Sequence, residues 1–84
     1  MKNIIASELK DTINLMISDD YRDRFAAELL QLKIRRRKLS DMLINWKRLG
    51  FEPKCPFEIL VIQLKIMDAY IEILEARRLL YEKE

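Results

Sequence analysis

Four large apolar residues recur at intervals of seven in the middle of this 84-residue chain. They are Phe25, Leu32, Leu39 and Trp46. A repeat of seven keeps side chains on one side of an α-helix and is typical of a coiled-coil-like seam. The chain must therefore set a long amphipathic helix against at least one other helix. We predict that this helix covers about residues 20–49.

Capping and turn residues bound this helix at both ends. Asp20, with Asp23 three residues later, imitates a capping box at the start. Gly50 is expected to end the helix in the left-handed conformation. The following loop, 51–56, is short and holds both prolines of the chain, and Pro56 suits the start of another helix. A loop this short predicts an antiparallel helical hairpin.

The second arm of the hairpin, about residues 56–82, has two apolar seams. One seam contains Phe57, Leu60, Leu64, Met67, Ile71 and Leu74, and the other contains Ile59, Ile62, Ile66, Tyr70 and Ile73. A helix that is apolar over most of its circumference is buried on more than one side. Each additional Ile or Leu that becomes buried contributes roughly 1.5–3 kcal/mol. We therefore expect a homo-oligomer whose centre is built by this helix.

The fold class that follows is all-α, with no alternating run long enough for a strand. A short helix over about residues 3–17 precedes the long hairpin, and residues 1–84 form one helical domain. At this length a lone core is marginal, so we expect assembly as a homo-oligomeric helical bundle.

A basic block, Lys33-Ile34-Arg35-Arg36-Arg37-Lys38, lies inside the first arm. Residues 20–54 carry ten Lys and Arg against five Asp and Glu, whereas residues 55–84 are acidic on balance. Helical geometry spreads the block over several sides. Arg35 and Arg36 are expected to border the apolar seam, Lys33 and Arg37 to lie on another side, and Lys38 to face solvent.

A charged side chain at the edge of a core needs a partner of opposite charge. For Arg35 and Arg36 that partner is either a carboxylate of the chain, with Glu28, Glu72 and Glu75 as the candidates, or the phosphate of a ligand. A guanidinium binds phosphate through two parallel hydrogen bonds. The sequence leaves both alternatives open.

Tyr21 opens the same helix, where free backbone amides favour anions. Its ring could stack on a base, with Arg22 and Arg24 as neighbouring cations. The other interpretation makes Tyr21 a packing contact at the helix start.

The chain has no His and no Gly-rich phosphate loop, and its one cysteine, Cys55, has no visible activator. We therefore expect no enzyme activity, no metal and no cofactor. An early charge argues against a signal peptide, and the longest charge-free apolar run of the third helix is too short to cross a membrane. A reducing cytoplasm is the expected location.

Non-specific DNA binding is a further possibility for the basic segment. The cations scatter around the helix instead of forming one stripe, and no helix-turn-helix pattern is present. Nucleic acid is therefore the third choice of partner.

Several segments together resemble a family of short proteins from phages of gut and Gram-positive bacteria, including crAss-like phages. They are 20–25, 28–35, Phe51-Glu52-Pro53-Lys54-Cys55-Pro56 and 74–77. The resemblance covers about residues 19–80, and the Pro-x-Cys-Pro turn is its most specific part. It implies a phage origin and a helical hairpin.

Tyr21-Arg22-Asp23 at a helix start, a basic residue four turns on and a Pro-led second helix are similar to the phage anti-CBASS sponges. Those proteins are helical oligomers that sequester cyclic di- and trinucleotide immune signals without cleaving them. The resemblance implies that Tyr21 stacks on a base, that Arg35 or Arg36 contacts phosphate, and that Arg77 corresponds to a late basic residue.

The function predicted from the sequence is non-enzymatic sequestration of a cyclic nucleotide or related immune signal by a phage protein in the host cytoplasm. The pockets would lie between protomers, with Tyr21, Arg22, Arg35, Arg36 and Arg77 as ligand-binding residues. The alternative is a helical interaction module that binds a host or virion protein.

Overall fold

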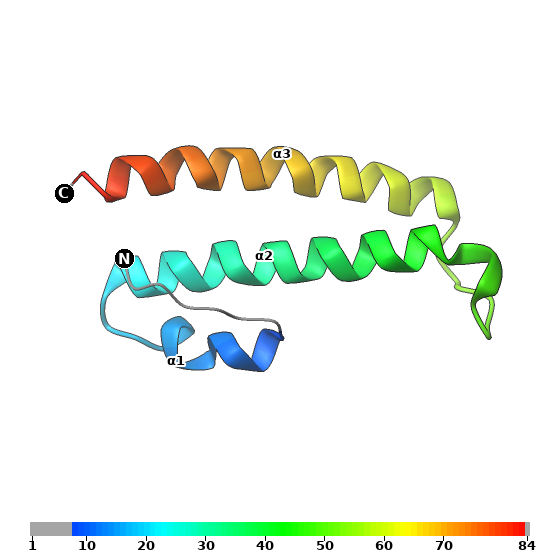
Figure 1. Cartoon of the computed structure of the whole chain (residues 1–84), viewed down its shortest axis with the longest axis horizontal. Coiled ribbons are helices and arrows are strands. Elements are labelled where there is room, and N and C mark those ends of the chain that lie inside the picture. The colour runs from blue at the N-terminus through cyan, green and yellow to red at the C-terminus, as the bar shows by residue number, and fades with distance from the viewer. Residues whose placement is uncertain (1–7, 84) are drawn as a thin grey trace.

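A computed structural model describes residues 8–83, and every regular element in that range is a helix (Figure 1). In chain order these elements are the 3-10 turn η1 (Leu9–Thr12), α1 (Ile13–Met16), α2 (Tyr21–Ile44), the 3-10 turn η2 (Trp46–Arg48) and α3 (Phe57–Tyr81). The prediction of an all-α helical hairpin is confirmed.

The three helices lie in one layered arrangement with α2 in the middle (Figure 1). α3 runs antiparallel to α2 along one side of it, and α1 lies on the opposite side. α3 is therefore an edge element of the described chain, with α2 as its main helical neighbour.

The core lies between α2 and α3 near the open end of the hairpin. Phe25, Leu29 and Leu74 form its buried cluster, and Leu74 has no exposed surface. Leu32, Ile71 and Tyr81 pack against this cluster. The apolar seam of α2 and the first seam of α3 therefore meet as their spacing predicts.

The segment formed by η1 and α1 lies against the other side of α2. The Gln31 side chain donates a hydrogen bond of 2.8 Å to the hydroxyl of Thr12, which is fully buried. Ala27 and Ile34 stand four residues before and three residues after Gln31, so they lie on the same side of α2, and both are buried. α2 is thus covered on two sides.

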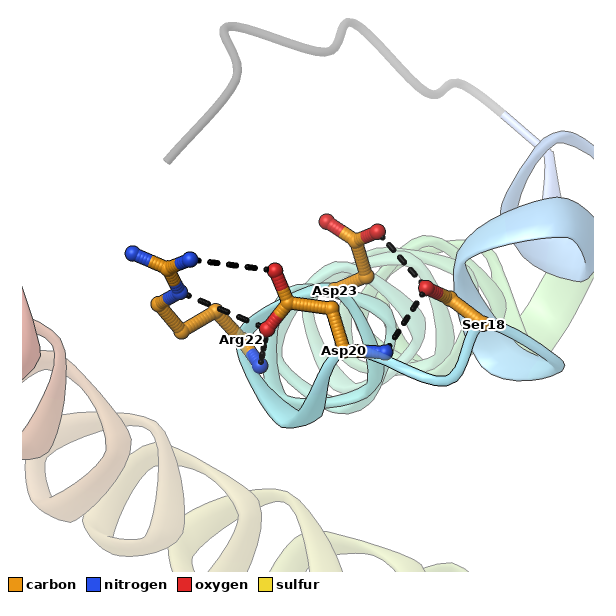
Figure 2. Close-up of polar contacts among 4 residues, drawn as sticks. All are labelled: Ser18, Asp20, Arg22 and Asp23. Carbon is orange, nitrogen blue, oxygen red and sulfur yellow. Dashed lines mark hydrogen bonds and ion pairs between the residues drawn. The ribbon is translucent and has the colours of Figure 1, made fainter.

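The start of α2 is fixed by side chains that replace missing helical partners (Figure 2). The Asp20 carboxylate accepts a 2.9 Å hydrogen bond from the backbone N–H of Arg22. The Ser18 hydroxyl accepts a 3.1 Å bond from the Asp20 N–H and donates a 2.8 Å bond to Asp23. Asp23 thus supports the cap through Ser18.

The end of α2 differs from the prediction. The helix stops at Ile44, five residues before the expected end, and a 3-10 turn follows. The Asn45 side-chain amide donates a 2.8 Å hydrogen bond to the Asp41 carbonyl, and such local bonds compete with helix continuation. The predicted left-handed cap at Gly50 is wrong, because no glycine among the described residues has a positive φ.

The other boundaries can be compared over the described range. α3 begins and ends within one residue of the predicted 56–82. Before α2, the described chain contains only the 3-10 turn and the four-residue α1, so the predicted helix over 3–17 is much shorter there. The part of that prediction that falls on residues 1–7 lies outside the described residues.

The second apolar seam of α3 is exposed to solvent. Four of its residues, Ile59, Ile62, Ile66 and Ile73, expose 55, 56, 63 and 60% of their surface, and Tyr70 exposes 41%. We call the exposed row Ile59, Ile62, Ile66, Ala69, Ile73 and Ala76 the outer face of α3. Exposed contiguous apolar residues of this kind mark interaction surfaces. The homo-oligomer stays a prediction.

Candidate functional site

Tyr21 is the first residue of α2 and keeps 46% of its surface exposed. Its ring meets the ring of Tyr81 edge-on, with 5.8 Å between centroids and an angle of 88° between planes. Tyr81 in turn lies 4.8 Å from Phe25 in the same edge-on geometry. One side of the Tyr21 ring is thus supported by packing, which suits a stacking platform.

Arg22 follows on an exposed part of the same turn. Its Nε and Nη2 atoms lie 3.3 and 3.2 Å from the two carboxylate oxygens of Asp20 (Figure 2). The backbone N–H and then the side chain of Arg22 lower the pKa of Asp20. The same contact that caps the helix therefore holds Arg22 in place.

Arg77, near the end of α3, stacks on the aromatic residues at this end of the hairpin. Its guanidinium carbon lies 4.9 Å from the Phe25 ring centroid and 5.5 Å from that of Tyr81. Nε and Nη2 donate hydrogen bonds of 3.0 and 2.8 Å to the Tyr81 hydroxyl, which is the main reason that the pKa of Arg77 is raised. The fold therefore brings Tyr21 and Arg77 to one end, where both contact Tyr81.

A carboxylate completes this end of the molecule. Glu28 accepts a hydrogen bond from the Tyr70 hydroxyl and lies 4.0 Å from Nη1 of Arg77. This hydrogen bond is the main cause of the raised pKa of Tyr70. Arg77 thus already has partners within the chain, and a bound phosphate would have to compete with Glu28.

Three cations of the basic block pair with carboxylates of the same chain. Lys33 pairs with Glu75 at 2.5 Å, Arg36 with Asp68 at 2.8 Å and Lys38 with Glu8 at 2.9 Å. All three pairs are substantially exposed. Pairing within the chain, one of the two alternatives for Arg36, is therefore present.

The partner of Arg36 is not one of the predicted glutamates. Asp68 accepts a second hydrogen bond from Arg36, at 3.5 Å, and its carboxylate is the main reason that the pKa of Arg36 is raised. Glu28 and Glu75 instead contact Tyr70 and Lys33. The antiparallel register decides this, because it sets Asp68 opposite Arg36.

Arg35 differs from Arg36 although the two are adjacent. It is exposed, and it has no hydrogen-bond or ion-pair partner among residues 8–83. The expectation that both arginines border the seam therefore does not hold for Arg35. Its guanidinium donors are available to a ligand.

Tyr21 and Arg35 lie on nearly the same side of α2, two heptads apart. At 1.5 Å per residue they are about 21 Å apart along the helix. Glu28 occupies the position midway between them. Within one chain, a ligand that reached from Tyr21 to Arg35 would pass over a carboxylate.

A depression at the other end of the hairpin contains residues that sequence reasoning had assigned to the core. It has a volume of about 650 Å³ and is lined by Leu43, Ile44, Asn45, Trp46, Lys47, Arg48 and Phe57. The rings of Trp46 and Phe57 meet at 5.2 Å. Because α2 ends before Trp46, this ring leaves the heptad seam and forms part of the wall.

Residues 8–83 contain no cluster of three or more His, Cys, Asp or Glu side chains that could hold a metal ion. Within the same range, no helix has the length and apolar character needed to span a membrane.

The fold and its residues define a small all-α hairpin protein with aromatic and basic groups at its open end. A protein-family model named Sequestin matches residues 19–78, which cover most of the chain. The protein belongs to the Sequestin family. No match was found among curated proteins or among solved structures.

The matched segment covers α2 and most of α3, and α1 lies outside it. All five predicted ligand-binding residues fall within 19–78. The family name denotes sequestration and so agrees with the coarser expectation of a binding protein.

Proposed function

We propose that this protein sequesters a cyclic nucleotide or a related nucleotide immune signal without cleaving it. It would act as a phage-encoded anti-defence sponge in the cytoplasm of the infected host. The observation that carries the proposal is the Sequestin match over residues 19–78, which include every residue proposed to bind ligand.

The proposed roles follow from the surroundings of each residue. Tyr21 stacks on a base, because its ring is half exposed and braced by Tyr81. Arg35 binds phosphate, since its donors have no partner in the described chain. Arg22, Arg36 and Arg77 contribute through guanidinium groups already positioned by Asp20, Asp68 and Tyr81.

The pocket is proposed to lie between protomers. Tyr21 and Arg35 are about 21 Å apart on one helix, with Glu28 between them. A phosphate near Glu28 would be repelled, whereas a second chain can bring its own Arg35 close to Tyr21. Residues fixed on rigid helices also keep the ordering cost of binding low.

Heating after binding tests the proposal. The purified protein is incubated with a panel of cyclic and linear nucleotides of one to three bases, filtered, and then heat-denatured. Sequestration predicts that one class of nucleotide disappears from the filtrate and returns chemically unchanged after heating. A changed product would indicate an enzyme, and no depletion of any nucleotide would contradict the proposal.

A second candidate is a helical module that binds a host or virion protein, and the exposed outer face of α3 favours it. Immobilised protein that retained one host or virion protein, and lost it when Ile66 was replaced by Asp, would support this candidate. Duplex DNA is the third candidate. DNA binding is less favoured because carboxylates pair with Lys33, Arg36 and Lys38 and leave less positive charge for the DNA backbone.

A further inference from the structure

The outer face of α3 has a spacing that matches itself when reversed. The face is a single row of six residues, Ile59, Ile62, Ile66, Ala69, Ile73 and Ala76, at successive intervals of three, four, three, four and three. All six residues are exposed. A row with this spacing reads the same in both directions, so it can pair residue by residue with an antiparallel copy of itself about a two-fold axis.

We propose that the outer face of α3 binds the same face of a second copy, antiparallel, about a two-fold axis that passes between residues 67 and 68. In this register Ile62 lies opposite Ile73 of the second copy. Ile66 lies opposite Ala69, and Ile59 lies opposite Ala76. The occupant of the face is thus a second copy of this chain.

The distribution of large and small residues favours this direction. Each alanine in the row faces an isoleucine, so no layer of the interface consists of two alanines. A parallel two-fold pair would set Ala69 against Ala69 and Ala76 against Ala76, which would leave gaps between bulky isoleucine layers. Antiparallel pairing therefore fills the interface more evenly.

Charges on one flank of the row favour the same register. Lys65 and Glu72 are seven residues apart, on the same flank, and both are exposed. Neither has an ion-pair partner among residues 8–83. In the proposed register, Lys65 of each copy faces Glu72 of the other. The side chains also tilt toward each other, because helical side chains point to the N-terminus of their own helix.

A shift by one heptad would be disfavoured by the same charges. It would bring Lys65 against Lys65 and Glu58 against Glu72 of the second copy. The charges of Lys65 and Glu72 therefore favour the proposed register over the register shifted by one heptad, whereas the apolar row alone would separate the two only weakly.

This interface goes beyond the nucleotide pocket and does not depend on it. The residues of this row belong to α3, whereas Tyr21 and Arg35 belong to α2, so pairing through the row does not itself use either of the two proposed ligand-binding residues. The α3 pair alone does not complete a pocket that takes Tyr21 from one chain and Arg35 from another. Completing that pocket requires a further contact between chains.

The association state, measured without nucleotide by sedimentation equilibrium, tests the proposal. The wild type should be at least dimeric at micromolar concentration, and Ile66→Asp should lower its mass by at least a factor of two. Ile44→Asp is the matched control, because Ile44 is 78% exposed but lies outside α3. It should keep the wild-type mass. A monomeric wild type, or an Ile66→Asp variant with the wild-type mass, would overturn the proposal.

A charge exchange tests the direction and register. Lys65→Glu and Glu72→Lys should each raise the α3-pair dissociation constant roughly tenfold, because attraction becomes repulsion at two symmetric positions. The double variant should return it to near the wild-type value. A double variant as weak as the single ones would overturn the antiparallel register. Nucleotide depletion, assayed separately, reports on the proposed function alone.

Discussion

Arg36 of α2 and Asp68 of α3 form an ion pair with 2.8 Å between Nε and Oδ1, thirty-two positions apart in the chain. The pair links the two arms of the hairpin halfway along α3. Next to it, Arg35 points to no partner within residues 8–83. Two adjacent arginines thus have different surroundings, and this difference leads to the first prediction.

Arg35→Ala should weaken nucleotide binding by at least tenfold with no change in melting temperature, because Arg35 has no partner to lose. Arg36→Ala should weaken binding less and lower the melting temperature slightly, because its exposed pair with Asp68 is lost. Calorimetric titration and thermal denaturation measure the two effects. Equal losses of binding, each accompanied by destabilisation, would show that Arg35 has no separate role.

Leu74→Ala should lower the free energy of unfolding by about 2–5 kcal/mol, because Leu74 is fully buried between Phe25 and Leu29. Leu79→Ala is the matched control on the same helix, since Leu79 is 57% exposed and lies outside the outer face. It should change the value little. Urea denaturation measures both, and similar costs would contradict the described core.

Acid should remove a contribution of Glu75 to stability. Hydrogen bonds from Lys33 and then from Arg78 lower the pKa of Glu75 below its ordinary value of 4.5. The unfolded chain therefore takes up this proton more readily than the folded chain. The contribution of the Glu75 carboxylate to the free energy of unfolding is complete above pH 4.5. It is lost as the pH falls through the lower pKa of the folded state.

The difference in free energy of unfolding between the wild type and Glu75→Gln should therefore become smaller as the pH falls below 4.5. Urea midpoints measured across this range give the comparison. A gap that stayed constant with pH would mean that Glu75 titrates alike in the folded and unfolded chains.

Asp20→Ala should lower the melting temperature by a few degrees, since it removes the acceptor for the backbone amide of Arg22, the second residue of α2, and the ion-pair partner of its side chain. Asp20→Asn should recover part of the loss, because asparagine is also a good cap. Asp19→Ala is the control, because Asp19 takes no part in the capping contacts of Figure 2. An equal effect at Asp19 would argue against a specific cap.

The hairpin could be predicted from the sequence because heptad spacing and a Pro-bounded turn act locally. The end of α2 could not be predicted. The sequence favours a cap at Gly50, but the hydrogen bond from the Asn45 side chain to the Asp41 carbonyl forms where the helix ends five residues earlier. Asp68 was not predicted as the partner of Arg36, because the path of the loop sets the register between the arms. Arg77 and Tyr81, however, stand four residues apart, so their contact could have been found from helical spacing.

The central claim is that a nucleotide is held by Tyr21 of one protomer and Arg35 of another, and mixing two inactive variants tests it most directly. Tyr21→Ala and Arg35→Ala are each expected to lose nucleotide depletion. The two variants are denatured together in equal amounts and refolded, so that their chains mix at random in the oligomers. A pocket then has an intact Tyr21 in half of the cases and an intact Arg35 in half, which predicts about a quarter of the wild-type capacity. A refolded mixture that depletes no more nucleotide than either variant alone would contradict a pocket shared between chains.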